Sequence, residues 1–474
     1  MNNKTKSITT NMRYAVTANF AILAVGVILN LFVPKVINVT DFGYWQIYTF
    51  YSSFALFLNI GWLDGIYLRF GGEEYEDLNK EIFGTQFWLL LLFQVTISIL
   101  LIILANLFVS SPDKKTVLVL VSVTSLILNL KFFIIYLFQT TNRIKDYSLI
   151  SQNDRYIYIF FLLGYFFCGG RSYVMLIIFD IIANVIVTCW GMLRIKDIIF
   201  KPLKISSNVL LEVRENISVG INLMISNIAS KLMVGVSRII VENNWDVDTF
   251  GKLSLTLSIS NMFLTFVNAI GIVIFPVLRK TDRSNMKKIY TEIRPFFVFI
   301  TYVLLLSFIP IKFVLGVWLP NYRESLNFMI LLFPMIVYEG RMSLLVSTYL
   351  KVLREERTIL AVNLISLVVA LFSSLISAYF LQNLNLTVAS ILIVIMVRCI
   401  LAENRLIKKM NMNIRNENIF ETLLTLLFII SNIFFNNVIA FIVYLVCITV
   451  FFVQKKENIL KGVKNFSAFV KTKK

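Results

Sequence analysis

The sequence predicts an all-α polytopic membrane protein with about 14 transmembrane helices. Of its 474 residues, 58% are hydrophobic and only 15% are charged, whereas soluble domains are near half apolar and a quarter charged. The apolar runs, such as residues 87–109, are long and continuous, and they lack the alternation expected of strands in a membrane barrel. This composition excludes a soluble globular enzyme and a disordered chain.

Each predicted span is long and apolar enough to cross a bilayer, and the segments between spans are too short for a soluble domain. Residues 1–12 are polar, and the first apolar run is too long for a signal peptide, so the first span is expected to be retained. The predicted spans are 14–37, 44–68, 82–109, 116–139, 154–168, 172–193, 215–241, 248–278, 295–317, 325–350, 358–380, 385–402, 419–435 and 437–453.

A short internal repeat suggests two halves. Val39-Thr40-Asp41-Phe42-Gly43 resembles Val247-Asp248-Thr249-Phe250-Gly251 at an offset of 208 residues, which equals six predicted spans. Because six is even, the halves would be parallel repeats about an axis along the membrane normal. The predicted domains are an N-terminal six-helix bundle, a cytoplasmic interfacial linker helix, a C-terminal six-helix bundle, and two extra helices with a basic cytoplasmic tail, at residues 1–193, 194–214, 215–402 and 403–474.

The linker should lie in the membrane interface, with its basic residues on anionic headgroups. Its apolar residues are expected to face lipid; they are Ile198, Ile199, Leu203, Leu210 and Leu211.

The net charge of +18 comes mostly from the segments on one side of the predicted membrane map. If the N-terminus is cytoplasmic and the segments alternate, lysine and arginine are concentrated in the cytoplasmic segments. The external segments hold few basic residues, namely Lys35, Lys114, Lys115, Arg171 and Arg323. This asymmetry predicts a multi-pass protein with both termini in the cytoplasm. It also attributes the positive charge to topology and anionic lipids, so nucleic acid is not expected as a partner.

Catalytic chemistry has little support in the sequence. Histidine is absent, which excludes a Ser–His triad and histidine metal ligands. The four cysteines are far apart in or beside apolar runs and form no CxxC motif. No lysine follows a glycine-rich phosphate loop. We therefore predict that the chain is not an enzyme and has no metal site and no cofactor.

Charged residues near the middle of spans are the main functional candidates, because a charge at mid-bilayer costs about 2.5–3.5 kcal/mol. Lys131, Lys231 and Arg341 are basic residues in such positions, and Asp180 and Glu339 are the acidic ones. These side chains should face a watery cavity or each other. By contrast, near the ends of their spans a long side chain can reach the interface, which is the expectation for Lys252, Lys312 and Arg398.

Polar residues also form stripes along three predicted spans, and such stripes turn inward in hydrocarbon. They either join helices or line a basic cavity. The stripes contain Asn19, Gly26 and Asn30 in the first span, Gly220, Asn227, Lys231, Gly235 and Arg238 in the seventh, and Ser254, Ser258, Asn261, Thr265 and Asn268 in the eighth.

The opening of the chain resembles that of a known transporter family. The first span contains Pro34 and is followed by Thr40-Asp41-Phe42-Gly43-Tyr44-Trp45, and the next span ends in Leu63-Asp64-Gly65-Ile66-Tyr67-Leu68-Arg69-Phe70. This pattern resembles Wzx-type oligosaccharide-lipid flippases of the multidrug/oligosaccharidyl-lipid/polysaccharide exporter superfamily. The two six-helix halves and two extra spans also fit that family, although the chain has Ile37-Asn38 where the family often has Leu-Gly.

The resemblance implies a function in the bacterial inner membrane. Such flippases move undecaprenyl-diphosphate-linked (polyprenyl-linked) oligosaccharide repeat units to the outer leaflet by alternating access around a cationic cavity, for O-antigen or capsule synthesis. Glycosyltransferases and a polysaccharide polymerase would then be functional partners. The residues predicted to bind substrate are Lys131, Lys231, Arg238, Arg341, Asn19, Asn30, Asn227, Asn261 and Asn268.

Transport without ATP needs another energy source, and a carboxylate in a low dielectric can exchange a proton near neutral pH. The candidates for proton or sodium coupling are Asp64, Asp180 and Glu339. Three other functional classes remain open: a multidrug or cation exporter of the same fold, a membrane glycosyltransferase or polymerase, and a structural scaffold. The exporter would need an acidic site, the enzyme would need a large external loop or clustered carboxylates, and the scaffold would not explain intramembrane charges.

Overall fold

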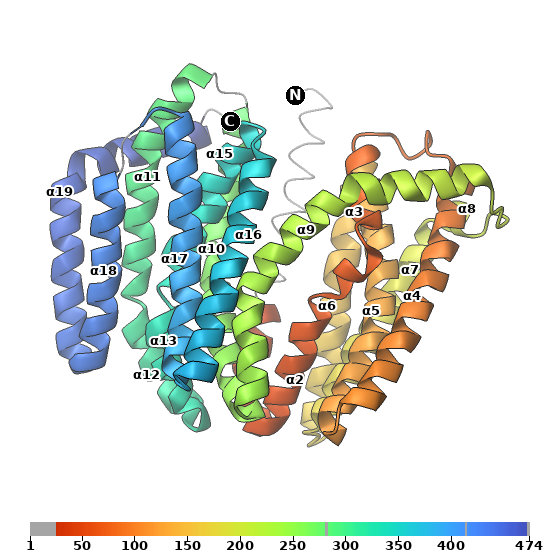
Figure 1. Cartoon of the computed structure of the whole chain (residues 1–474), viewed down its shortest axis with the longest axis horizontal. Coiled ribbons are helices and arrows are strands. Elements are labelled where there is room, and N and C mark those ends of the chain that lie inside the picture. The colour runs from red at the N-terminus through yellow and green to blue at the C-terminus, as the bar shows by residue number, and fades with distance from the viewer. Residues whose placement is uncertain (1–24, 280–282, 413–414, 472–474) are drawn as a thin grey trace. The chain divides into compact units, whose positions relative to one another are not determined.

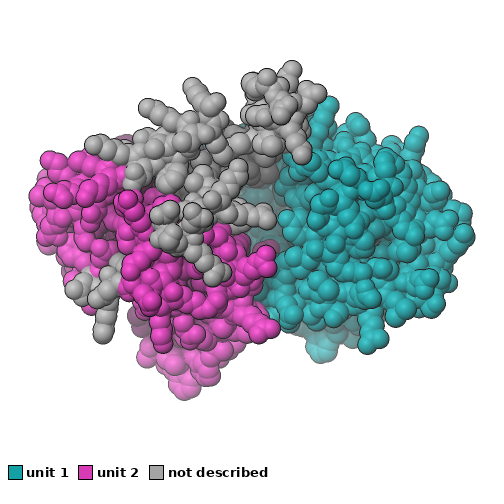
Figure 2. All heavy atoms as spheres, turned by 90° about the horizontal axis from the view of Figure 1, so that it is seen from above, with its two compact units in different colours: residues 1–228 teal, residues 229–474 magenta. Residues whose placement is uncertain are grey.

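The computed structural model describes residues 25–279, 283–412 and 415–471, and every regular element in them is a helix (Figure 1). The chain divides into two compact units, which comprise residues 1–228 and 229–474 (Figure 2). The boundary between the units falls within one long helix, α9 (Ser207–Asn244). The predicted all-α membrane fold is therefore confirmed, and we describe each unit separately.

The first described element of unit 1 is an apolar helix over Val25–Val36. The helices that follow are α2 (Val39–Ser52), the short η1 (Ala55–Asn59), α3 (Trp62–Arg69), α4 (Lys80–Phe108), α5 (Pro112–Thr140), α6 (Ile144–Phe167), α7 (Tyr173–Arg194) and the one-turn α8 (Lys196–Ile199). Local signals set several of these boundaries. The side chain of Asn79 accepts a hydrogen bond from the backbone N–H of Ile82 at the start of α4, and Pro112 occupies the first turn of α5.

Unit 2 contains the second part of α9 and a longer series of helices. They are α10 (Val247–Arg279), α11 (Arg283–Leu305), α12 (Phe308–Trp318), η2 (Pro320–Tyr322), α13 (Arg323–Leu332), α14 (Met335–Arg341), the π-helical η3 (Met342–Val346), α15 (Ser347–Val352), α16 (Glu356–Leu375), the π-helical η4 (Ile376–Phe380), α17 (Leu384–Lys409), α18 (Arg415–Phe434) and α19 (Asn437–Lys471). The bend of 48° between α13 and α14 occurs at Phe333-Pro334, because proline cannot continue the helical hydrogen-bond ladder.

The two units share one packing scheme. In unit 1, α5 is central and contacts α2, α4, α6 and α7. In unit 2 the bent helix α13–α15 occupies the corresponding place, because it contacts α10, α11, α16 and α17. The same order of helices therefore packs in the same way twice, as expected for parallel repeats. The two further helices, α18 and α19, pack against each other and against α13 and α11 respectively.

The predicted span 44–68 is broken in the structure. Between α2 and α3, Ile60 and Gly61 adopt left-handed conformations with φ of 57° and 80°. Buried amides satisfy the backbone groups that the break frees: Asn129 Nδ2 donates to the carbonyl of Ala55 (2.9 Å) and Gln94 Nε2 to that of Leu58 (3.2 Å). A broken helix at membrane depth is tolerated when the protein supplies such partners.

The backbone of α3 lies directly against that of α9 within unit 1. A Cβ added to Gly65 would lie 1.8 Å from the carbonyl oxygen of Asn216, and one added to Gly220 would lie 2.0 Å from that of Gly61. Arg69 closes the contact by ion pairs to Glu212 (2.8 Å) and Glu215 (2.7 Å), both on α9. Only glycine permits this approach, so these positions specify how α9 begins.

Ten of the predicted spans coincide with helices of sufficient length and apolarity among the described residues, if the bent α13–α15 counts as one. Four do not: the span 14–37 lies partly outside the described residues, 44–68 is broken, and the helices over 154–168 and 248–278 do not meet the same criterion. The exact number of 14 spans therefore stays a prediction.

Residues 194–214 do not form the single interfacial helix that we predicted. Helix α7 continues to Arg194, α8 has only four residues, and α9 begins at Ser207. Ile198 and Ile199 are fully buried in the core of unit 1 and do not face lipid, whereas Leu203, Leu210 and Leu211 are about half exposed. The reason is that α8 packs against α4, so its apolar side chains have a protein partner.

Polar contacts also hold α8 in place. Asp197 accepts a hydrogen bond from Tyr75 (2.8 Å) and forms an ion pair with Lys80 (2.8 Å). Burial opposes ionisation of Asp197, but these contacts outweigh it, and the pKa of the carboxyl group is lowered from its ordinary value.

Candidate functional site

Helix α9 presents two different faces in unit 2. Ser230 accepts a hydrogen bond from Arg398 Nη2 (3.1 Å), and Ser237 shares one with Ser374 (2.7 Å). These serines are seven residues apart and therefore lie on the same side of the helix, which faces the interior of unit 2. The next residue, Lys231, lies about 100° around the helix, and its side chain is exposed.

The neighbouring helix α10 runs back along α9. Arg238 Nη2 donates to Ser254 Oγ (2.8 Å), and its guanidinium lies 5.0 Å from the centre of the Phe250 ring. Seven residues before Arg238 on α9 is Lys231, and seven residues after Ser254 on α10 is Asn261, whose side chain is also exposed.

The remaining asparagines of the predicted stripes differ in position. Asn227, one turn before Lys231, is exposed, and Asn30 is half-buried and donates to the carbonyl of Gly26 (2.8 Å). Asn19 lies outside the described residues, and the side chain of Asn268 is outside them as well. In the seventh-span stripe, Gly220 does not share the exposure of Asn227, because it packs against α3.

Lys131 is buried in a closed triad in unit 1. Its ammonium group lies 2.8 Å from Asp154 Oδ2 and donates to Asn184 Oδ1 at 2.5 Å. The three residues come from α5, α6 and α7, so the triad joins three helices. The positive charge of Lys131 is thus already balanced.

Arg341 belongs to a buried charge network in unit 2. It pairs with Glu421 and lies 3.5 Å from Glu403, and Arg294 pairs with the same two carboxylates at 2.7 Å each. Asn418 accepts hydrogen bonds from both arginines, at 3.0 and 2.8 Å. The network connects α11, α14, α17 and α18, and it anchors the first of the two extra helices to the rest of unit 2.

The candidate coupling carboxylates have different surroundings. Asp180 accepts a hydrogen bond from Tyr48 (2.6 Å) and lies 3.6 Å from Arg155. Glu339 pairs with Arg398 at 3.0 Å. Asp64 is half-buried at the start of α3, and no basic group of the described residues lies within ion-pair distance of it.

The structure corrects one expectation and adds residues that the sequence reasoning missed. Arg398 does not extend to the interface: it is 7% exposed and pairs with Glu339, because a carboxylate is available inside the unit. The missed residues are Asp154, Arg294, Glu403 and Glu421. Asp154, Arg294 and Glu403 lie at or beside the ends of predicted spans, where charged residues are expected in loops. Among these four residues, Glu421 lies inside a predicted span, so its charge could have marked it as a candidate.

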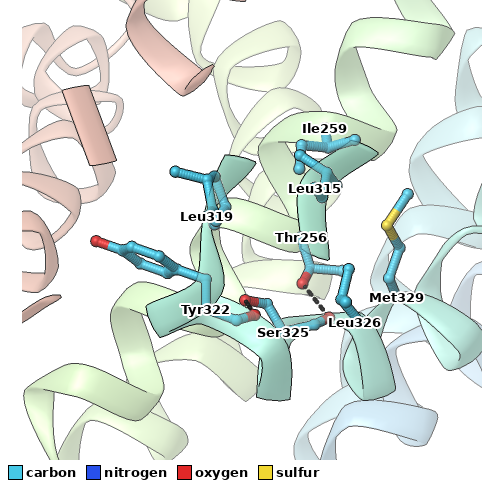
Figure 3. A pocket seen from close by; sticks show the side chains of 9 residues that line it. Thr256, Ile259, Leu315, Leu319, Tyr322, Ser325, Leu326 and Met329 are labelled. Atoms are coloured by element: carbon cyan, nitrogen blue, oxygen red, sulfur yellow. Dashed lines mark hydrogen bonds between the residues drawn. The ribbon is translucent and has the colours of Figure 1, made fainter. Parts of the chain in front are cut away.

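Four pockets of unit 2 lie away from the predicted substrate and coupling residues, although Arg294 and Glu421 of the charge network line one of them. A cavity of about 10 Å³ between α10, α12 and α13 is lined mainly by apolar side chains, and in it Thr256 donates to the carbonyl of Ser325 at 3.0 Å (Figure 3). It is no larger than a single water needs. Three wider pockets of unit 2, of about 410, 220 and 360 Å³, are likewise not lined by any of the predicted substrate or coupling residues.

The long apolar helices of the described residues define a multi-pass membrane protein. The family model for polysaccharide biosynthesis proteins matches residues 8–282, and the chain belongs to this family. None of the curated proteins compared with the chain matches it. The resemblance to oligosaccharide-lipid flippases is thereby confirmed at the level of the family, and its members are transporters and not enzymes.

Solved structures share the fold. The lipid II flippase MurJ, in an inward closed conformation, gives a TM-score of 0.70 at 13% identity, over 93% of this chain and 99% of that one. A multidrug resistance MATE family transporter of the MOP superfamily, in an inward-facing conformation, gives 0.64 at 13% identity, over 83% and 94%. A MATE protein in the straight conformation gives 0.55 at 14% identity, over 86% and 97%. At these identities the likeness concerns the fold alone.

Proposed function

We propose that the protein is a flippase that moves undecaprenyl-diphosphate-linked oligosaccharide repeat units from the cytoplasmic to the outer leaflet of the bacterial inner membrane. Membership of the polysaccharide biosynthesis family and the fold shared with the lipid II flippase MurJ support a lipid-linked glycan as cargo. The glycan would feed O-antigen or capsule synthesis, with glycosyltransferases upstream and a polymerase downstream. The basic segments would face anionic lipids of the cytoplasmic leaflet.

The exposure of Lys231 is the observation that carries this proposal. Lys131 and Arg341 are buried and balanced by carboxylates, so an incoming diphosphate would have to break existing pairs to reach them. Lys231 is not buried in this way, because its side chain is exposed, and a diphosphate is an anion that a lysine binds as a point charge. Arg238 lies about 10 Å further along the helix and would take the diphosphate next, as alternating access moves it along a cationic path.

The polar neighbours of Lys231 suit a sugar. Asn227 and Asn261 are exposed, and each amide offers both donors and an acceptor for sugar hydroxyl groups. Asn19, Asn30 and Asn268 remain predicted sugar-binding residues from the sequence alone. The identity of the sugars would depend on these polar groups and on aromatic side chains near them.

The test is complementation of surface-polysaccharide display, with the membrane level of each variant measured in parallel. Lys231→Ala should weaken transport about tenfold or more, since one charge-assisted contact contributes about 1.5–3 kcal/mol. Lys231→Arg should retain part of the activity. Lys312→Ala, which removes another intramembrane lysine of unit 2, is the matched control and should display normally. Full display by a well-expressed Lys231→Ala/Arg238→Ala variant would overturn the proposal.

A multidrug or cation exporter is the second candidate, because the MATE transporter shares the fold. A cationic cargo needs an acidic site, and Asp64 is the carboxylate that would serve it. The two functions give opposite results for the same variants. An exporter would tolerate Lys231→Ala and lose drug resistance with Asp64→Asn, whereas the proposed flippase would change display and leave drug resistance unaltered.

A further inference from the structure

All three nitrogens of the Arg398 guanidinium donate hydrogen bonds within unit 2. Nε donates to Asn363 on α16 (2.9 Å), Nη1 contacts both oxygens of Glu339 on α14 (3.0 and 3.1 Å), and Nη2 donates to Ser230 on α9 (3.1 Å). Arg398 itself is on α17, so a single side chain joins four helices. A rigid planar fork of donors makes this possible, and a lysine could not replace it.

Unit 1 also contains a cation that is bound by one carboxylate and one amide, but among the described residues this cation has no hydrogen bond to a serine of α9. Lys131, Asp154 and Asn184 are a cation, an anion and an amide on α5, α6 and α7. In unit 2, Glu339, Asn363 and Arg398 come from the helices that take the corresponding places in the packing scheme. Lys131 shows that a carboxylate and an amide suffice to satisfy the cation. The bond from Arg398 to Ser230 is therefore additional to charge balance.

That additional bond acts on the turn of α9 that carries Lys231. Ser230 and Lys231 are consecutive, so fixing Ser230 toward Arg398 fixes the direction in which Lys231 leaves the helix. The second bond on this face, between Ser237 and Ser374, prevents rotation two turns further on. Glu339 in turn fixes the guanidinium that holds Ser230.

We propose that Arg398, oriented by Glu339, is a positioning residue that acts through Ser230 to present Lys231 to the diphosphate of the substrate. This inference rests on the proposed function, because it assigns Lys231 its role. It gives Glu339 a part in orienting the binding helix. It also explains why an arginine and not a lysine stands at position 398.

The first measurement is the mobility of a nitroxide attached at position 231, which requires no transport. The label is placed on Lys231→Cys after Cys168, Cys189 and Cys447 have been replaced by serine; Cys399 is buried and stays. Arg398→Gln and Ser230→Ala should both increase mobility at this site. A label at exposed Leu386 on α17 should not change. Ser366→Ala, which removes a buried hydroxyl without a partner among the described residues, is the matched serine control.

The second measurement is a double-mutant cycle in the display assay. Ser230→Ala should reduce transport about threefold, and Arg398→Gln about tenfold. Neither substitution should reduce transport much further in a Lys231→Gln background. If both residues act through Lys231, their effects and that of Lys231→Gln are non-additive. Arg398→Lys should be expressed at the normal level but should retain only part of the transport, because a lysine lacks the planar fork of donors.

The outcomes distinguish the positioning role of Arg398 from the proposed flippase function. An unchanged spectrum at position 231 in both Arg398→Gln and Ser230→Ala overturns the inference, even if Lys231 proves essential. Undiminished effects in the Lys231→Gln background overturn it too, since they indicate a purely structural role. Normal transport by Lys231→Gln itself overturns the proposed function, and with it the role of Arg398 in that function.

Discussion

At the scale of single residues, the intramembrane basic side chains differ in burial: Lys131 and Arg341 are buried, whereas Lys231 is exposed. A mid-bilayer charge that faces lipid costs about 2.5–3.5 kcal/mol, and Lys131 and Arg341 avoid this cost through carboxylates on other helices. Removing one member of such a pair leaves the other buried alone, which costs about 3–5 kcal/mol. Substitutions at these two sites therefore disturb the fold, whereas a change at exposed Lys231 addresses function more directly.

The carboxylates lead to a prediction about energy coupling. Asp180→Asn should lower transport because it leaves Arg155 with Asp154, which already pairs with Lys131, as its one remaining carboxylate among the described residues, and Asp180→Asn/Arg155→Gln should recover it. Asp64→Asn should abolish gradient-driven transport without any such recovery, since Asp64 has no ion-pair partner among the described residues. Display is measured alongside uptake into vesicles with and without a proton or sodium gradient. If the double variant at 180 and 155 stays inactive, Asp180 has a role beyond balancing Arg155.

At the scale of elements, the sequence predicted most spans but not their irregularities. Apolar periodicity and length locate a helix such as α5, which is long and has a proline and an acidic residue in its first turn. The break in the second span is invisible to the same criteria, because Asn59 and Gly61 look like ordinary members of an apolar run. What permits the break is a set of amides on other helices, and sequence spacing does not reveal that Gln94 and Asn129 meet there.

The same limit applies to the candidate site. A polar stripe along the seventh span was evident from its spacing, yet the stripe has different environments along its length. Gly220 is enclosed by α3, while Lys231 is exposed. Which members face outward depends on packing between helices that are far apart in the chain. The partners of Arg341 were missed for the same reason, because Glu403 and Glu421 belong to helices that follow it by many residues.

The contact between α3 and α9 yields a prediction at this scale. Gly65→Ala should destabilise the protein by about 1–3 kcal/mol or more, because a Cβ there would overlap the backbone of Asn216 and force the helices apart. Gly164→Ala is the matched control: this glycine lies in α6 with open space around its Cα, so alanine should be neutral or slightly stabilising. Thermal unfolding in detergent compares the two, and equal stability would argue against the close packing.

At the scale of the whole molecule, two units with one packing scheme carry different polar interiors. Each has a triad of cation, anion and amide on corresponding helices, but the cation is a lysine on α5 in unit 1 and an arginine on α17 in unit 2. The repeated scheme accounts for the fold. The units differ in that the triad of unit 2 also contacts α9 through Ser230, and in that unit 2 contains the two further helices α18 and α19. We therefore expect functional residues among those that differ between the two units, such as Arg398 and Ser230.

The distribution of basic residues over the whole chain gives the last prediction, which concerns topology. Lysine and arginine are dense in alternate segments and sparse in the others, so both termini should be cytoplasmic. In intact cells of a variant without the exposed native cysteines, a membrane-impermeant thiol reagent should label Asn244→Cys and Gln382→Cys, which lie at predicted external ends. Lys464→Cys should react only after the cells are opened. Both external sites are exposed in the structure, so absence of labelling there could not be explained by burial. Labelling of position 464 from outside would show that the predicted orientation is wrong. The basic segments would then lie against the outer leaflet, contrary to the positive-inside rule.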